Sequence, residues 1–250
     1  MKQIAASESR IELPRQIAQE PSISKIIEIA PTDEQILAPK ARIVFASNAI
    51  QQPSYQTKRT SCHYLLQTLL CSISATQRHC WELEYSASGA PALASDGNHS
   101  LYISMARSGN WLAAGVSYHA KIGIDIECIK PRTNISERAE FLNWKVPVVD
   151  LKDFYAKWTL WEASAKCVRG SVFMKNNPGF NKLCRIDTRD RIGRCEHWSG
   201  LHDCLDEQAF YAVVLQSENN TDLNHKILCP GKTETWSVSN THYSAKALQG

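Results

Sequence analysis

The sequence lacks any long hydrophobic run, any secretory leader and any large excess of charge of one sign. Its longest apolar stretches, such as Trp111–Val116, are far shorter than the roughly 20 residues that span a bilayer, so we predict no membrane-spanning helix. The N-terminal segment has no continuous apolar core of the kind a secretory signal needs. A formal net charge of +3 is too small to indicate nucleic-acid binding by bulk electrostatics. We therefore expect a cytoplasmic protein that binds neither nucleic acid nor membrane.

The cysteines form no C-x-x-C pair, and their odd number and irregular spacing fit reduced thiols better than a disulfide framework. The densest group of possible zinc ligands is Cys195-Glu-His197-Trp-Ser-Gly-Leu-His202-Asp-Cys204. Its intervals are short, because structural zinc sites more often use C-x-x-C knuckles separated by longer segments. A metal-binding module built on these residues is therefore one rival hypothesis.

The composition, with 43% hydrophobic and 21% charged residues, is that of an ordinary globular protein. Residues 1–40 are rich in Ser, Glu, Gln and Pro, which favours an extension of loops or loosely attached helices. Apolar residues at helical spacing predict a helix from Lys58 to Ile73 that packs on a sheet. Short apolar runs predict two antiparallel strands, Trp111–Ser117 and Ile122–Glu127, joined as a hairpin by residues 118–121.

Further elements follow this hairpin. They are helical material from Pro131 to about Asn143, a strongly periodic helix from about Leu151 to Val168 that Gly170 ends, and a strand at Phe210–Leu215. Both halves of the chain thus contain helix and strand, which fits a duplicated α+β unit. We place the halves at 41–125 and 126–217, with a tail of unclear structure at 218–250.

The predicted strand Ile122–Glu127 carries its two acidic residues on one face. Its isoleucines alternate with Gly123, Asp125 and Glu127, so the two sets point to opposite sides. Same-face neighbours lie about 7 Å apart, so in a partly dry cleft the two carboxylates repel unless a proton or cation lies between them. A hard divalent cation would remove this conflict. The alternative is an amphipathic strand whose polar face is simply exposed to water.

The periodic helix adds a third carboxylate. Its apolar stripe consists of Leu151, Phe154, Tyr155, Trp158, Trp161 and Ala165. Glu162 falls inside this stripe, and Lys166 follows one turn later at its edge. A carboxylate among aromatic side chains loses its hydration at a cost unless it is given partners, which predicts a site. The alternative is an ordinary Glu–Lys pair that stabilises the helix only weakly.

The segments Gly123-Ile-Asp125-Ile-Glu127 and Trp158-Thr-Leu-Trp-Glu162-Ala-Ser-Ala-Lys166 together resemble the paired signatures of the phosphopantetheinyl transferases, G-x-D-x-E and W-x-x-K-E-A-x-x-K. Lys130-Pro131 follows the first signature. By length and layout the chain is most similar to the larger, monomeric branch, typified by the surfactin synthetase-activating enzyme. The resemblance covers residues 55–216.

The resemblance extends to two further segments and shows departures in both. Gly89-Ala-Pro91 is placed like the family's G-K-P, and residues 104–111 are placed like its N-x-S-H-S-G-x-W segment. The departures are Ala90 for the usual lysine, Ala106 and Arg107 for the usual Ser-His, and Trp161 for the lysine before the key glutamate. Arg107 can still make a charge-assisted phosphate contact. We therefore expect altered coenzyme A binding, not its loss.

The resemblance implies an α+β fold, with two similar subdomains related by a pseudo-two-fold axis and the active site in the cleft between them. It implies an enzyme that transfers 4'-phosphopantetheine from coenzyme A to a serine of an apo acyl or peptidyl carrier protein, releasing 3',5'-ADP. The implied Mg2+ ligands are Asp125, Glu127 and Glu162. The implied coenzyme A contacts are Arg59, Arg107, Ser108, Asp125 and Lys166.

The resemblance also implies roles in the reaction for three charged residues. Glu162 is the candidate for deprotonating the carrier serine, Lys166 for neutralising or protonating the leaving phosphate, and Asp125 for holding the metal. We expect a monomer. The rival functional hypothesis is a catalytically inactive relative that acts as a carrier-protein-binding adaptor. Retention of all three acids and of Lys166 argues against it, because buried charges are costly to keep without a use.

Overall fold

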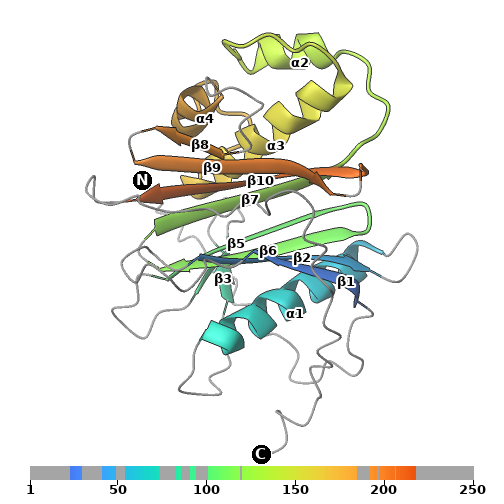
Figure 1. Cartoon of the computed structure of the whole chain (residues 1–250), viewed down its shortest axis with the longest axis vertical. Helices are drawn as coiled ribbons and strands as arrows, with labels where there is room; N and C mark the ends of the chain where they lie inside the picture. Colours follow the sequence, from blue (N-terminus) through green and yellow to red (C-terminus); the bar gives the residue numbers. More distant parts are fainter. Residues whose placement is uncertain are drawn as a thin grey trace, which may run out of the picture.

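The computed structural model describes residues 23–29, 41–48, 54–73, 83–85, 91–93, 101–118, 120–184, 192–195, 197–205 and 207–217. These residues form a mixed α and β fold arranged in layers (Figure 1). Helix α1 (Tyr55–Ile73) lies on one sheet, a second sheet follows, and helix α3 (Leu151–Cys167) lies on the outer face of that second sheet. Among the described helices, none combines the length and the apolar character that crossing a membrane requires.

The first sheet is antiparallel, in the order β1-β2-β6-β5. Its strands are β1 (Ile23–Ile29), β2 (Ala41–Asn48), β6 (Trp111–Tyr118) and β5 (Leu101–Ser108). β1 falls in the segment 1–40, where the sequence predicts loops or loosely attached helices, so that expectation is wrong for residues 23–29. This stretch contains four isoleucines, and β-branched residues favour strands. Two short strands, β3 (Leu83–Tyr85) and β4 (Pro91–Leu93), pair with each other beside β5.

The second sheet is also antiparallel, in the order β7-β10-β9-β8. Its strands are β7 (Ala120–Cys128), β10 (Ala209–Ser217), β9 (Trp198–Leu205) and β8 (Ile192–Cys195). Short helices α2 (Ile135–Phe141) and α4 (Pro178–Leu183) flank α3. The strand predicted at Phe210–Leu215 and the helix predicted after Pro131 are confirmed as β10 and α2.

The predicted hairpin of two paired strands is wrong, although both strands exist. β6 pairs with β2 on one edge and β5 on the other, whereas β7 pairs with β10. Because both edges of β6 are occupied, its backbone groups leave no place for β7. The chain therefore passes from one sheet to the other between residues 118 and 120, and the boundary placed at 125/126 lies inside β7.

The two sheets meet where β5 and β7 lie side by side. The contact is made by serine side chains of β5 that accept hydrogen bonds from β7. Ser104 Oγ accepts from the amide of Ile124 at 2.9 Å, and Ser108 Oγ accepts from the amide of Cys128 at 3.0 Å. The contact nearer the start of β5 (Ser104) is also the one nearer the start of β7 (Ile124), and the later contact joins Ser108 to Cys128. β5 and β7 therefore run parallel.

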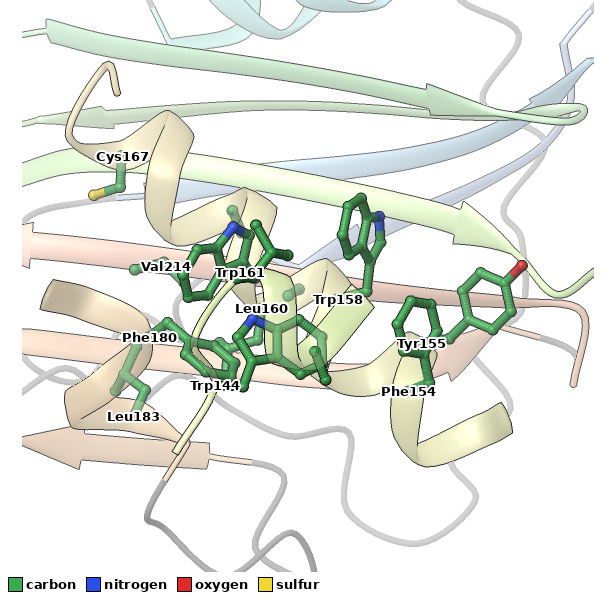
Figure 2. Packing of buried hydrophobic residues seen from close by; sticks show 14 of the residues in the cluster. Trp144, Phe154, Tyr155, Trp158, Leu160, Trp161, Cys167, Phe180, Leu183 and Val214 are labelled. Atoms are coloured by element: carbon green, nitrogen blue, oxygen red, sulfur yellow. The ribbon is translucent and has the colours of Figure 1, made fainter. Parts of the chain in front are cut away.

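Buried side chains divide the interior between these layers. One cluster fills the space between the two sheets and includes Ile122, Ile124 and Ile126 of β7. Another joins α1 to the first sheet. The third surrounds α3 with aromatic rings from several elements, among them Trp144, Phe154, Trp161 and Phe180 (Figure 2). Their ring centroids lie 5.0 Å apart for the Trp161–Phe180 pair, an edge-to-face contact.

The alternation predicted for β7 is confirmed. Its isoleucines face the inter-sheet core, and Gly123 faces α3 so closely that a Cβ there would lie 1.9 Å from the Ala163 carbonyl oxygen. The predicted end of α3 is nearly right. The helix ends at Cys167, and the residue with the left-handed backbone is Arg169 (φ 53°), while the amide of Gly170 donates back to Ala165 O at 2.8 Å.

Candidate functional site

The carboxylates of Asp125, Glu127 and Glu162 come together between β7 and α3. One oxygen from each lies within 4.8 Å of the others. β7 supplies two of them because alternate residues share its α3 face, and α3 supplies the third from the face that packs on β7. Within the described part of the chain, no other group of three or more His, Cys, Asp or Glu side chains is close enough to hold a metal ion.

Lys166 lies beside these three acids and pairs with one of them. Its Nζ lies 2.7 Å from Oδ1 of Asp125. The Asp125 side chain is only 4% exposed, whereas that of Lys166 is 30% exposed and reaches solvent. The second oxygen of Asp125, Oδ2, is buried and has no hydrogen-bond partner among the described residues. A buried carboxylate oxygen without a donor is costly, so this atom is a candidate ligand position.

The electrostatics of the cluster favour a bound cation. Burial raises the pKa of Asp125 well above its ordinary value, against the opposing effect of Lys166. Burial likewise raises the pKa of Glu162, and the charge of Glu127 adds to the effect. Burial acts to lower the pKa of Lys166, but the charges of Asp125 and Glu162 outweigh it, so this pKa is raised. Lys166 is therefore a stable cation, and the carboxyls need a proton or a further cation to share their space.

The donor set fits Mg2+. Hard divalent cations prefer oxygen ligands, and all three side chains offer carboxylate oxygens. Lys166 balances one of the negative charges, which leaves the two that a divalent ion would neutralise. The unpartnered Oδ2 of Asp125 gives such an ion a ligand that no described residue occupies. Asp125, Glu127 and Glu162 are thus the residues that would hold it.

Ser108, expected to contact coenzyme A, contacts the acidic cluster in this structure. Its hydroxyl donates to Oε2 of Glu127 at 2.8 Å and accepts from the amide of Cys128 at 3.0 Å. Its one proton and one of its two acceptor lone pairs are therefore used within the protein. No sequence pattern indicates this contact, since Ser108 and Glu127 belong to different sheets.

Arg59 and Arg107 gather in a second cluster, on the α1 side of the first sheet. The Arg59 guanidinium lies 5.6 Å from the centre of the Tyr85 ring. The Tyr85 hydroxyl is hydrogen-bonded to Nε2 of His63, which is buried. Burial lowers the pKa of His63 to about 4, and the charges of Arg59 and Arg107 contribute. The two guanidinium groups of this cationic cluster could bind an anionic phosphate. No sequence motif marks His63 or Tyr85 as belonging to it.

Cys62 lies on α1, in the core between that helix and the first sheet. Its thiol is close enough to the carbonyl oxygens of Ala106 and Ala113 to donate to them, at 3.6 and 3.5 Å. Burial raises the pKa of this thiol to about 11, while the positive charges of both Arg107 and Lys166 act to lower it. Arg107 of the first sheet and Lys166 of α3 therefore both act on the same buried thiol.

Tyr155, which precedes Glu162 on α3, makes a group of contacts that no sequence pattern indicates. The Tyr155 hydroxyl donates to the Lys130 carbonyl at 3.1 Å and accepts from the Lys130 amide at 3.2 Å and from Arg132 Nε at 2.8 Å. The Arg132 guanidinium also lies 5.4 Å from the centre of the Tyr155 ring. Its charge acts to lower the pKa of Glu162, although burial dominates and raises it. Tyr155 thus fixes the position of the segment that follows β7, and it holds Arg132 where the guanidinium charge acts on Glu162.

The departures from the family pattern fall in different surroundings. Ala106 is buried in the inter-sheet core, and Ala90 lies outside the described residues. Trp161 is buried and donates from Nε1 to the Val172 carbonyl at 2.8 Å, within the aromatic cluster of Figure 2. The position that carries a lysine in the family is therefore part of the core here.

The zinc hypothesis gains no support from the described residues. Of its four candidate ligands, His202 and Cys204 lie on β9, and the side chain of Cys195 lies outside the described part. The described side chains of this segment form no metal-binding group. No family model matches the chain, and no curated protein matches it either.

Proposed function

We propose that the protein is a phosphopantetheinyl transferase, which moves 4'-phosphopantetheine from coenzyme A to a serine of an apo acyl or peptidyl carrier protein in the presence of Mg2+. The observation that carries this proposal is the acidic cluster. Asp125, Glu127 and Glu162 lie within 4.8 Å of one another, and Lys166 is ion-paired to the first of them. These residues come from the two segments that resemble the family's signatures, and the fold brings the segments together.

The layered fold supports the proposal in a second way. Each four-stranded sheet carries one long helix on its outer face, α1 on the first and α3 on the second. We infer that these are the two similar halves of a pseudo-two-fold fold, with coenzyme A bound between them. The cationic and acidic clusters then contribute from opposite halves to one bound molecule.

The chain's own residues account for the chemistry. The carrier serine oxygen forms a bond to the phosphorus that bears the pantetheine arm, and the bond from that phosphorus to the oxygen of 3',5'-ADP breaks. Glu162 takes the serine proton, directly or through water. Lys166 neutralises or protonates the leaving phosphate. A divalent cation held by Asp125, Glu127 and Glu162 would supply positive charge to the phosphate oxygens.

Arg59 and Arg107 have a role in binding in this proposal. Both lie in the cationic cluster on the α1 side of the first sheet, and a guanidinium can bind a phosphate through two parallel hydrogen bonds. Arg107 stands where the family has a histidine, and we expect its guanidinium to contact a phosphate of coenzyme A in place of that histidine.

The test is intact-mass analysis of a panel of apo carrier proteins after incubation with the purified chain, Mg2+ and coenzyme A. We expect one carrier to gain one phosphopantetheinyl group, and the gain to vanish with a chelator or in Asp125→Asn. Glu140→Gln, which removes an exposed acid on α2, is the matched control and retains activity. A protein that neither binds coenzyme A nor modifies any carrier refutes the proposal. Binding of a carrier without coenzyme A binding would establish the adaptor function instead.

A further inference from the structure

The turn between β5 and β6 packs tightly against the end of β7. Ser108 Oγ accepts from the Cys128 amide at 3.0 Å, and Cys128 Sγ lies 3.1 Å from the Ser108 carbonyl oxygen, to which it donates. Gly109 has a left-handed backbone (φ 56°), and a Cβ on it would lie 2.4 Å from Cys128 Sγ. Glycine therefore allows the turn to approach Cys128, and the two sheets are locked together at this point.

The proton of the Ser108 hydroxyl is directed at the acidic cluster. A serine hydroxyl has a single proton to donate, and here it goes to Oε2 of Glu127 at 2.8 Å. A hydrogen bond to a carboxylate is charge-assisted and stronger than one between neutral groups. Glu127 precedes Cys128 in the chain, so the same serine restrains the backbone and the side chain of this acid. Among the described residues, Ser108 is the only hydrogen-bond donor to Glu127.

We propose that Ser108 is a positioning residue that holds Glu127 in the acidic cluster. The acids and Lys166 all belong to the second sheet and its helix, but the orientation of Glu127 is set by the first sheet. Asp125 is restrained by Lys166 in the same way that Glu127 is restrained by Ser108. A side chain as long as glutamate loses substantial rotamer freedom when it is held, so removing the hydroxyl returns that freedom to the metal-free protein. The metal-binding part of this inference rests on the proposed function.

Ser104 provides a matched control on the same strand. Its hydroxyl accepts from the Ile124 amide at 2.9 Å, so it ties β5 to β7 as Ser108 does. The Ile124 side chain faces the inter-sheet core, and Ser104 has no contact with an acid in the described structure. Ser104→Ala therefore reproduces the loss of a sheet-to-sheet contact without changing the support of Glu127.

The first test is titration calorimetry of the metal-free full-length chain with Mn2+ alone, as a stand-in for Mg2+. We expect Ser108→Ala to weaken Mn2+ binding about tenfold, as the loss of an outer hydrogen bond to a metal ligand does elsewhere. Ser108→Thr keeps the hydroxyl and should bind within about twofold of the unsubstituted protein. Ser104→Ala should lower the urea midpoint but leave Mn2+ affinity unchanged. Unchanged affinity in Ser108→Ala, or an equal loss in Ser104→Ala, would overturn the proposal.

The second test needs no metal and separates this inference from the proposed function. A double-mutant cycle of Ser108→Ala and Glu127→Ala, measured by urea unfolding in chelator, should show a coupling of about tenfold in the unfolding equilibrium constant. If the unsubstituted protein binds no Mn2+ but the cycle shows this coupling, the proposed metal site fails while the positioning of Glu127 stands. Additive effects of the two substitutions would refute the positioning role.

Discussion

Lys166 Nζ lies 2.7 Å from Oδ1 of Asp125, and this ion pair joins the last turn of α3 to the middle of β7. The pair is asymmetric, because the aspartate is buried and the lysine reaches solvent. Losing the lysine would leave a buried negative charge beside two other acids, and breaking a buried pair in this way is strongly destabilising. Both the stability of the metal-free protein and the charge of its site therefore depend on one contact.

Lys166→Met should lower the free energy of unfolding of the metal-free protein by about 2 kcal/mol at pH 8, a value reduced for the exposure of the lysine. Urea unfolding followed by circular dichroism measures it. Lys152→Met, which removes an exposed lysine from the same helix, should cost less than about 0.5 kcal/mol. Equal losses in the two variants would show that the Asp125 contact contributes nothing.

The free energy of unfolding should depend on pH because the carboxyl groups of Asp125 and Glu162 are buried. Burial raises the pKa of Asp125 and of Glu162, so above the unfolded values near pH 4 the folded chain binds more protons than the unfolded chain. The stability that these groups contribute is fully present below those values and is lost as pH rises through the folded pKa values. In the metal-free protein, the free energy of unfolding of Asp125→Asn should therefore fall less as pH rises than that of the unsubstituted protein.

Unfolding in urea at a series of pH values, with and without Mg2+, measures this effect. Added Mg2+ should stabilise the unsubstituted protein more at pH 8 than at pH 5, since its ligands must lose their protons to bind it. A stability curve for Asp125→Asn with the same slope as the unsubstituted protein would contradict the assignment of the buried charge to this residue.

His63 should stay neutral far below the ordinary range of histidine. Its pKa is lowered to about 4, first by burial and then by Arg59 and Arg107. The stability that neutral His63 contributes is present above pH 6.5 and is lost as pH falls through the folded pKa. Side-chain NMR of the imidazole measures this pKa directly. In Tyr85→Phe the pKa should remain low, because burial is the main cause; a return to about 6.5 would identify the Tyr85 hydroxyl as the cause instead.

Gly123→Ala should destabilise the protein by about 3 kcal/mol, as severe overpacking does. The added Cβ would lie 1.9 Å from the Ala163 carbonyl oxygen and 2.5 Å from the Cys167 amide, and backbone atoms cannot move aside without lifting α3 from β7. Gly170→Ala is the control, because its Cβ meets the flexible end of Met174 at 2.6 Å. Thermal unfolding should separate the two variants clearly. Similar melting temperatures would show that α3 can shift at no cost.

Much of the site could be predicted from the sequence because its signals are local. Alternation along residues 122–127 places Asp125 and Glu127 on one face, and the stripe on α3 identifies Glu162 and Lys166; in the structure these four residues meet. Each inference needs only the periodicity of one strand or one helix. The assignment of this cluster to phosphopantetheine transfer stays a prediction.

The contacts that the sequence could not reveal are those between elements. The run from Trp111 to Glu127 has the pattern of two strands and a turn, but which edges pair depends on β2 and β5, and no local pattern encodes that choice. The same holds for the Ser108–Glu127 hydrogen bond and for His63 and Tyr85, whose partners lie on separate elements. The buried face of α3 is also wider than the predicted stripe, since Ser164, which is not one of the stripe residues, is buried.

The chain leaves the first sheet after β6 and enters the second sheet at β7, and this division affects which segments can be exchanged by recombination. A segment starting at β7 contains every acid of the cluster and Lys166, and exchange of that segment between related genes would transfer the charges intact. It would not transfer Ser108, which belongs to the other sheet. On the proposed role of Ser108, a recombinant should therefore keep Glu127 in position only when its β5 carries a serine at position 108.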